Sequence, residues 1–495
     1  MGFAPDGRVT LENNAPVNPF GQYVLYWMTG ARRTRFNHAL DHARAHAAAL
    51  GRPLLVFEAV RAGYDWAAPR HHAFLRDGMR DNAARFAAAG IRWVGHIEPA
   101  PGASAGLLDA LAAQACLVVR DASPVFFLPR LGRGFVARCP VRVEAVDAVG
   151  VLPLSAADRP FPTAHAFRRH LQKVLPAHLR APPQADPLAG PPAAPVALER
   201  SAFARWPLLH SPAEVDAVDL RALPLAGAVP PAPGQRGGEA AAQARWAAFR
   251  DRGLDAYDSA RNEPAEVGGS TGLSPFFHYG MFSAWQILAD LEARHAWSAA
   301  DRGPPNAGSR EGWWGLPAAA EALLDQVLTW RELGHVFAAH VPDPESFGTL
   351  PDWARATLDA HRGDPRPSGF TLDRLEAADT PDPIWNAAQR QLRESGTIHN
   401  YLRMLWGKKI LGWAPTPEQA LEWSVTLNHR YALDGRDPNS TAGLTWIFGR
   451  FDRAWGPERP IFGTVRYMTS ENTARKYDLK PYLARWGAGP RAQRP

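Results

Sequence analysis

Cysteine is nearly absent from this chain, which has only Cys116 and Cys139 in 495 residues. Two thiols cannot build a disulfide framework or a cysteine-rich zinc site, so the sequence indicates a reducing compartment and predicts no metal ligands. Long hydrophobic runs are also absent, and residues 1–19 contain no apolar core of a signal peptide. A membrane-spanning helix needs about 20 apolar residues, so we expect a soluble, cytoplasmic protein that works away from membranes.

Two sequence patterns are missing as well. No G-x-G-x-x-G follows the first expected strand, at 23–28, so the usual dinucleotide-binding fingerprint is absent. No internal repeat is evident. Strand signals nearly disappear after residue 239, so the two halves of the chain are expected to differ in fold class.

The composition is that of a globular protein, with 46% hydrophobic and 21% charged residues. A chain of this length exceeds one ordinary core and predicts two or more domains. Lys and Arg (55) exceed Asp and Glu (49), which permits a nucleic-acid partner but does not by itself indicate one.

Residues 20–165 predict an α/β domain with a doubly wound parallel sheet, because strand patterns alternate with helical ones. The expected strands are 23–28, 53–58, 91–94, 116–119 and 141–146, and the expected helices are about 36–50, 70–89 and 107–114. Residues 1–19 are expected to be an irregular polar lead.

A linker region is expected at 166–238, where a basic helix gives way to proline-rich stretches at 181–195 and 223–238. Residues 239–485 then predict an all-helical domain, because their apolar positions follow the helical period.

The stretch at 385–446 is unusually rich in tryptophan, charge and amides. Gly396 can end one helix and Thr397 can cap the next. Trp406 and Trp413 lie seven residues apart and therefore share a helix face. Any one of these residues is more typical of a packed core, but together with the polar segment at 428–439 they favour a bound polar aromatic cofactor.

A second candidate site is the loop at 268–275, with the sequence GGSTGLSP. Hydroxyls and amides of a glycine-bearing loop at a helix entrance can cradle a phosphate. Alone, such a loop is more often an ordinary helix cap.

These motifs carry a resemblance. WNAAQ (385–389), HNYLRMLWGKKILGW (399–413), NHRYALDGRDPN (428–439), RYM (466–468) and RKYDL (475–479) resemble the FAD domain of the photolyase/cryptochrome family, closest to its class II cyclobutane pyrimidine dimer photolyases. The resemblance implies an enzyme that repairs these dimers in DNA by light-driven electron transfer from reduced FAD. It also implies a second, antenna chromophore of the deazaflavin or folate type in the amino-terminal domain.

The resemblance implies three sets of site residues. Arg403 and Asp434 match a buried ion pair beside the flavin, and Asn428 matches the residue near flavin N5. The FAD contacts it implies are Tyr257, Ser270, Thr271, Gly272, Leu273, Ser274, Arg403, Asn428 and Asp434. The electron-transfer tryptophans are Trp385, Trp406 and Trp413, with Trp406 nearest the flavin and Trp413 outermost. The lesion pocket is Gln326, Trp330, Met404 and Trp446.

One position departs from the pattern. Class II enzymes carry a glutamate four residues before the pocket tryptophan, whereas this chain has Gln326. Glutamine can donate and accept hydrogen bonds, but it cannot carry charge or supply a proton. The lesion type is therefore left open, and so are two alternatives: a cryptochrome-like blue-light photoreceptor signalling through a partner, or repair of a different photolesion.

The expected partner is DNA that contains pyrimidine dimers, bound by a monomer. Several basic residues are expected to form a track for its phosphates, although exposed charge of this kind more often only aids solubility. They are Lys408, Lys409, Arg450, Arg453, Arg466, Arg475 and Lys476.

Overall fold

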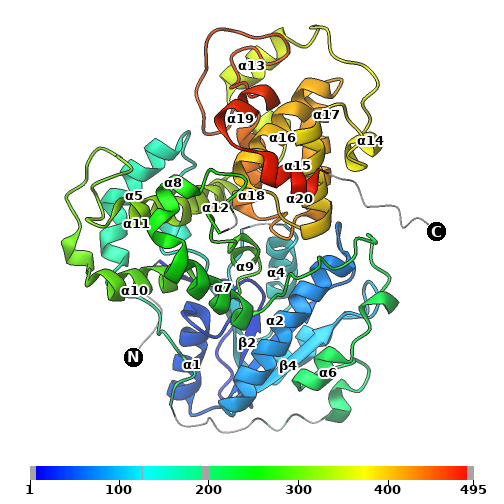
Figure 1. Cartoon of the computed structure of the whole chain (residues 1–495). Coiled ribbons are helices and arrows are strands. Elements are labelled where there is room, and N and C mark those ends of the chain that lie inside the picture. Colours follow the sequence, from blue (N-terminus) through cyan, green and yellow to red (C-terminus); the bar gives the residue numbers. More distant parts are fainter. Residues whose placement is uncertain are drawn as a thin grey trace.

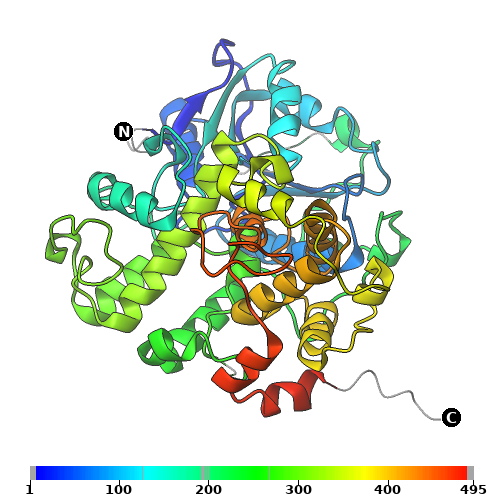
Figure 2. The same ribbon diagram turned by 90° about the horizontal axis from the view of Figure 1, so that it is seen from above.

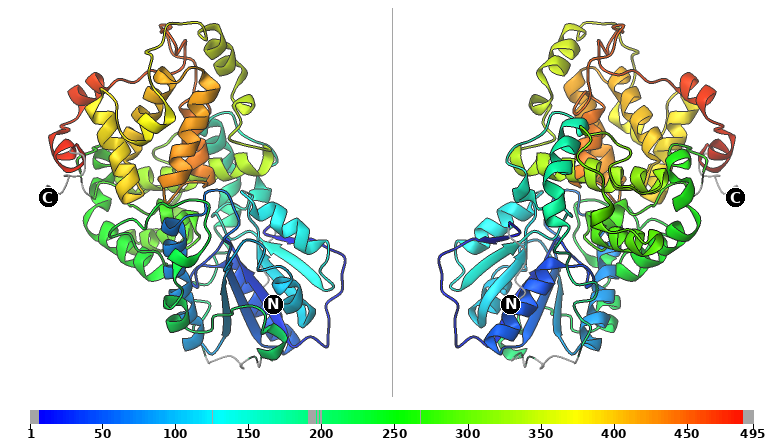
Figure 3. Two further views of the ribbon diagram at one scale, coloured as in Figure 1. Left: turned by 90° about the vertical axis from the view of Figure 1, so that its right-hand side faces the viewer. Right: turned by 90° about the vertical axis from the view of Figure 1, so that its left-hand side faces the viewer.

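The protein, described here from a computed structural model, joins a sheet domain to a larger helical region (Figure 1). In the side views the sheet domain (blue and cyan) lies below and the later helices (yellow to red) lie above it (Figure 3). The structure describes residues 7–124, 126–190, 196, 198, 200–266 and 268–487. Part of the proline-rich stretch at 181–195, namely 191–195, lies outside the described residues.

Six strands form one sheet in the order β1-β6-β5-β2-β3-β4, and every pairing is parallel except that of β1 with β6. The predicted α/β class is confirmed, and all five predicted strands are present. The strands are β1 (Val9–Leu11), β2 (Tyr23–Met28), β3 (Leu54–Val60), β4 (Arg92–Ile97), β5 (Ala115–Asp121) and β6 (Arg142–Val146).

Both faces of the sheet are covered by helices, which explains why the central strands are almost continuously apolar. Along β2, Val24, Tyr26 and Met28 belong to the core on one face, while the residues between them belong to the core on the other. The first core includes side chains of α1 (His38–Leu50) and α2 (Pro69–Ala88), and the second includes side chains of α3 (Leu107–Ala113) and α4 (Leu128–Val136).

The expectation of an irregular lead at 1–19 is wrong for β1, which pairs antiparallel with β6 at the edge of the sheet. Its three residues are mostly exposed and show no alternation that would identify a strand. β1 forms because it pairs with the edge of β6, which would otherwise be unpaired. The local sequence of β1 gives no sign of this pairing.

The helical region confirms the predicted all-α class, since residues 239–487 in the described part of the chain form no strand longer than an isolated bridge. Its helices are α7 (Glu239–Arg252), α8 (Tyr257–Ala260), α9 (Ser274–His278), α10 (Ala284–His295), α11 (Ala318–Leu324), the π-helix η6 (Asp325–Trp330), α12 (Arg331–His340), α13 (Asp352–Ala360), α14 (Leu372–Glu376), α15 (Pro383–Ser395), α16 (Asn400–Trp413), α17 (Pro417–Tyr431), α18 (Pro438–Trp446), α19 (Ser470–Lys476) and α20 (Lys480–Trp486). Seen from above, α19 and α20 (red) lie at the edge of the molecule (Figure 2).

The turn between α15 and α16 differs from the expectation in one respect. Gly396 ends α15 in the left-handed conformation, with φ of 70°, as predicted. Thr397 does not cap α16, which begins at Asn400 with His399 as its N-cap residue. The Thr397 hydroxyl instead lies 3.0 Å from the Ser395 hydroxyl, inside the turn.

Buried polar contacts tie the sheet domain to the helices. The Arg70 guanidinium on α2 donates to the carbonyl oxygens of Leu392 and Tyr431 at 3.3 and 2.9 Å. The Glu332 carboxyl on α12 accepts the backbone N–H groups of Val151 and Leu152 at 2.6 and 3.1 Å. Helix α5 (Ala164–His178) contributes Phe167, Leu171 and Leu175 to the same core as α1 and α2. The domain limits at 165 and 239 stay a prediction.

The two cysteines are free and buried. Of the helices in the described part of the chain, none combines the length and the apolar character that crossing a membrane requires.

Candidate functional site

A cavity of about 1340 Å³ opens in the helical region among α8, α9, η6, α16 and α18. Most of the predicted site residues line it, although they come from segments up to about 190 positions apart in the chain. They are Tyr257, Ser270, Thr271, Gly272, Leu273, Ser274, Gln326, Trp330, Arg403, Met404, Asp434 and Trp446. The other four, Asn428, Trp385, Trp406 and Trp413, do not line the cavity.

The predicted phosphate loop lies at one end of this cavity. Gly272 has φ of 62°, a conformation that glycine adopts without strain. The Thr271 hydroxyl accepts the backbone N–H of Leu273 at 3.2 Å, and α9 begins at the next residue. This helix is only five residues long, so the loop itself supplies most of the hydroxyls and N–H groups at this end of the cavity.

A cation that the sequence analysis missed lies beside the loop. The Arg245 guanidinium on α7 lines the cavity and packs so closely on Gly272 that a Cβ there would come within 2.5 Å of it. Arginine is well suited to phosphate, because its planar fork can bind two oxygens. Nothing in the local sequence separates Arg245 from the other arginines of its helix, so only the fold identifies it.

A charged network forms the floor of the cavity. The Arg403 Nη2 atom lies 3.1 Å from both carboxylate oxygens of Asp434, and both side chains are 10% exposed. The Ser440 hydroxyl accepts from Arg403 at 3.3 Å and from the Asn428 amide at 3.0 Å. Ser440 therefore links the ion pair to Asn428, and it too was missed by the sequence analysis.

Asn428 carries an orphaned polar atom. The residue is 1% exposed, and its Oδ1 atom has no hydrogen-bond partner among the described residues. Leaving a buried acceptor unpaired costs about 1–3 kcal/mol, so such an atom in a native structure needs an explanation, for instance an ordered water or a functional role.

The three predicted electron-transfer tryptophans form one contiguous row. The Trp385 and Trp406 rings are parallel within 2°, with centroids 6.4 Å apart. Trp413 meets Trp385 edge to face at 5.3 Å, so Trp385 lies between the other two. The Trp385 N–H donates to the Trp406 carbonyl and the Trp406 N–H to the Gln389 amide oxygen, both at 2.9 Å, which fixes both indoles in place.

The predicted lesion-pocket residues form another wall of the cavity. Gln326 and Trp330 are half-buried and lie on η6, a π-helical segment between two α-helices. Such segments are often found at functional sites. Asp325 also lines the cavity, but its carboxylate is engaged in a buried ion pair, with one oxygen 2.7 Å from the Arg168 guanidinium of α5. Gln326 is therefore the polar side chain of this segment that remains for a ligand.

Met404 and Trp446 border both this cavity and a smaller one of about 280 Å³. The exposed Arg466 guanidinium lies over the Trp446 ring, 5.6 Å from its centroid. The Lys408 ammonium lies 5.4 Å from the same ring centroid. Trp446 thus packs against two basic side chains and also lines the cavity.

The expected phosphate track is wrong for two of its members. Lys408 is fully buried and donates to the Ile447 carbonyl, and burial lowers the pKa of its ammonium to about 7. Arg450 is 9% exposed, and burial lowers its pKa to about 10. The sequence pattern predicts exposed charges at both positions, but the end of α18 covers Lys408 through Trp446 and Ile447. Arg453, Arg466, Arg475 and Lys476 are exposed.

A separate cavity of about 640 Å³ lies where the sheet domain meets the helices. Thr29 and Gly30 after β2 and Ser123 after β5 line it, so it lies at the carboxyl ends of the parallel strands, where the strand order reverses. Doubly wound sheets bind their ligands at this place. Arginines dominate its polar lining: Arg32, Arg33, Arg61, Arg130, Arg138, Arg331 and Arg436.

The curated relatives of this chain share one name. The chain matches no protein-family model. It is 31% identical over 472 residues to the deoxyribodipyrimidine photo-lyase of Methanothermobacter thermautotrophicus, covering 94% of this chain and 94% of the relative. It is 32% identical over 478 residues to the protein of the same name from Oryza sativa subsp. japonica, covering 94% of this chain and 87% of the relative.

Two solved structures share the fold. A class III photolyase from Agrobacterium tumefaciens aligns with a TM-score of 0.64 and 18% identity, over 96% of this chain and 86% of that one. A cryptochrome from Synechocystis sp. PCC6803 aligns with a TM-score of 0.67 and 15% identity, over 94% of this chain and 88% of that one. At these identities the likeness concerns the fold alone.

Proposed function

Because the chain belongs to the photolyase/cryptochrome family, with deoxyribodipyrimidine photo-lyases as its relatives, we propose that it repairs cyclobutane pyrimidine dimers in DNA with light, using FAD. One observation carries this proposal. A single cavity combines a phosphate loop, a fixed charge pair and flat apolar walls, so it suits a dinucleotide cofactor next to a flipped pair of bases. Its volume of about 1340 Å³ exceeds the roughly 300–1,000 Å³ of an ordinary small-molecule pocket.

The residues present fit FAD. The hydroxyls of Ser270, Thr271 and Ser274, with Arg245, would hold its pyrophosphate, because they gather hydrogen-bond donors and positive charge at one end of the cavity. Arg403 and Asp434 would hold its ring system, and Asn428 would act on it through Ser440, which lines the cavity and accepts from the Asn428 amide. When bound, FAD supplies the light absorption and the electron on which the repair depends.

The protein's own contribution is a fixed electrostatic setting. The Arg403–Asp434 pair is buried, so its field is little screened by water. Such a pair adds little to stability, because desolvation offsets most of the attraction. Its place in the cavity floor instead supports a role in setting the charge environment of the ring system.

The row of tryptophans supports light-driven activation of the enzyme. Trp413 is half-buried, whereas Trp385 and Trp406 are 0% and 1% exposed, so the row leads inward from the surface. Trp406 lies on the same helix as Arg403, which lines the cavity. An electron that enters from Trp413 can thus reach the cofactor region through aromatic rings in contact or near contact.

The lesion would lie between Trp330, Met404 and Trp446. Two adjacent bases of one strand that are flipped out of the duplex lose their stacking partners, and aromatic walls replace them at about 1–3 kcal/mol per base. Gln326 on the same wall would hydrogen-bond the dimer without charge. The exposed Arg453, Arg466, Arg475 and Lys476 would contact the DNA phosphates outside this pocket.

The cavity between the domains would hold the antenna chromophore. Its position at the strand ends and its arginine-rich lining suit an anionic ligand, a property shared by folates and deazaflavins. The class of the chromophore stays open. Reconstitution with a folate and with a deazaflavin is compared, and the matching type should produce energy transfer to FAD, visible as a fluorescence excitation band that Arg130→Ala weakens.

The decisive experiment illuminates the reduced protein with an oligonucleotide that contains a single cyclobutane dimer and follows loss of the lesion by chromatography. We expect light-dependent repair and no repair in the dark. A matched oligonucleotide with a (6-4) photoproduct tests the alternative lesion. A protein that binds FAD but repairs neither lesion is better described as a photoreceptor.

A further inference from the structure

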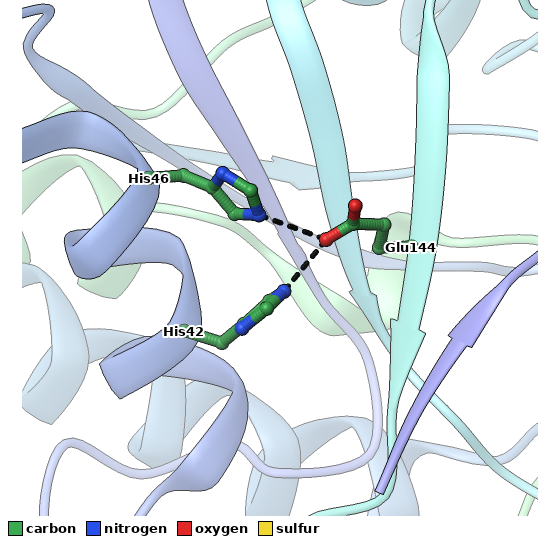
Figure 4. A group of neighbouring side chains, drawn as sticks. All are labelled: His42, His46 and Glu144. Atoms are coloured by element: carbon green, nitrogen blue, oxygen red, sulfur yellow. Dashed lines mark hydrogen bonds and ion pairs between the residues drawn. The ribbon is translucent and has the colours of Figure 1, made fainter. Parts of the chain in front are cut away.

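The structure assigns a divalent transition-metal site, with Zn²⁺ as the first candidate, to His42, His46 and Glu144 on the sheet domain. The juxtaposition is shown in Figure 4, where two imidazoles of α1 point at one carboxylate of β6. This site is independent of the proposed repair activity, since none of the three residues lines the cavities of about 640 and 1340 Å³.

The two histidines are placed by helix geometry. Residues four apart lie one turn apart on the same face of an α-helix, so His42 and His46 project together from α1. Their rings stand edge to face, with centroids 4.7 Å apart and planes at 86°. Both therefore direct the Nε2 atom toward a common point instead of stacking on each other.

The third ligand comes from β6, which lies under this part of α1. The Glu144 Oε2 atom is 2.6 Å from His42 Nε2 and 2.8 Å from His46 Nε2. All three donor atoms lie within 4.8 Å of one another. Tetrahedral zinc with bonds near 2.0–2.1 Å places its ligand atoms roughly 3.3 Å apart, so the cluster would open by less than about 1 Å to admit the ion.

The chemistry of the set matches a borderline metal ion. Two imidazoles and one carboxylate are ligands typical of Zn²⁺, and imidazole also suits Co²⁺, Ni²⁺ and Cu²⁺. A ligand carboxylate has to be ionised.

The surroundings favour a fixed site over two mobile surface histidines. The His42 side chain is 3% exposed, that of Glu144 10% and that of His46 13%, so the ligands are held in place but water can reach them. The Arg142 guanidinium lies 3.9 Å from the other Glu144 oxygen, Oε1, and thereby orients the carboxylate. An ion here would pin α1 to β6 and stabilise the sheet domain.

The scarcity of cysteine led to the prediction of no metal ligands, but histidine and glutamate can also bind a metal ion. The signal for the first two ligands is an H-x-x-x-H pattern on an expected helix, at 42–46. The third ligand lies about 100 positions further along the chain and is identified only by the pairing of β6 with its neighbours.

The test uses the full-length protein, stripped with a chelator and then titrated with Co²⁺, which reports tetrahedral coordination by its visible absorption. We expect a band that saturates near one equivalent and disappears when Zn²⁺ displaces Co²⁺. His46→Ala and Glu144→Gln should each weaken Zn²⁺ binding by at least about tenfold, because each removes one of three ligands. His165→Ala, which changes an exposed histidine of α5, is the matched control and should bind as the unchanged protein does.

Thermal unfolding gives a second readout. Zn²⁺ should raise the midpoint of the unchanged protein and of the control, and should have little effect on His46→Ala. The absence of a Co²⁺ band in the unchanged protein overturns the proposal even if a variant fails to fold. Binding that persists equally in His46→Ala and Glu144→Gln also overturns it, since the ion would then lie elsewhere.

Discussion

The tryptophans of the helical region fall into two groups with opposite surroundings. Trp385 and Trp406 are 0% and 1% exposed, and the N–H group of each has a fixed acceptor. Trp330 and Trp446 are half-buried and present part of their ring surface to the cavity of about 1340 Å³. Within one helical region, tryptophan is thus buried and hydrogen-bonded in one group (the locked group) and exposed to the cavity in the other (the accessible group).

The difference indicates what each group can do. Locked rings keep constant distances, as electron transfer requires, and they would serve equally well as ordinary core. Accessible rings can receive a base on a free face, which a packed core does not allow. Substitutions that separate stability, activation and lesion binding therefore test the division directly.

The largest effect is expected at Trp406. Trp406→Phe should abolish photoreduction of oxidised FAD, because it breaks the row at its inner end while FAD stays bound. Its stability should fall by about 1–3 kcal/mol, because the buried Gln389 amide oxygen loses its donor. Photoreduction is followed by absorbance under blue light, and Trp423→Phe, another buried tryptophan of the same core, is the control.

Chemically reduced Trp406→Phe should still repair DNA, because that route bypasses the row. Unchanged photoreduction in this variant would show that a different donor operates, and the locked group would then be core packing alone.

The next effect concerns Lys408, which lies between the two groups under Trp446. Burial lowers its pKa from 10.5 to about 7, so between these values the unfolded chain holds more protons than the folded protein. The free energy of unfolding should therefore rise with pH across that window, by up to about 1.4 kcal/mol per pH unit.

Lys408→Met should remove this slope, whereas Lys409→Met, a neighbour whose ammonium pairs with Asp382 at 2.9 Å, should retain it. Denaturant unfolding at several pH values measures the slope. Equal slopes in all three proteins would mean that Lys408 is solvated in the folded state.

A smaller effect is expected at the accessible tryptophans. Trp446→Ala and Trp330→Ala should each weaken binding to dimer-containing DNA by about 1–3 kcal/mol, because each removes a stacking surface. Binding to undamaged DNA should change little. Trp455→Ala, a half-buried tryptophan that lines none of the three cavities described above, is the control for general loss of aromatic surface. Equal weakening for damaged and undamaged DNA would exclude Trp446 from the lesion pocket.

Some parts of the fold and of the candidate site could be predicted from the sequence, and others could not. Strands such as 23–28 were predictable, because burial on both faces leaves a continuous apolar run. The edge strand β1 was not, since its pairing is non-local. The position of Lys408 could not be predicted either, because a charged residue on a helix gives no sign of whether another helix will cover it. The site residues came from ordered motifs, whereas Arg245 and Ser440 required the fold.

The smallest effect, and the sharpest test of the accessible group, is expected at Gln326. Its half-buried side chain lies on the cavity wall with Trp330, at the position where the sequence departs from the class II pattern that it resembles. A neutral amide can hold the dimer in its ground state by hydrogen bonds worth about 0.5–1.5 kcal/mol. It differs from a glutamic acid in how it stabilises extra negative charge on the dimer, because it has no proton to supply. Gln326→Glu should therefore change the quantum yield of splitting more than the dissociation constant, and Gln326→Ala should weaken both.

The three proteins are compared on one dimer-containing oligonucleotide, with binding measured in the dark and repair measured per absorbed photon. If the unchanged protein repairs nothing and Gln326→Glu gains repair, the natural substrate is another lesion or the protein is a photoreceptor. If all three behave alike, Gln326 does not contact the substrate, and the lesion lies against a different part of the cavity wall.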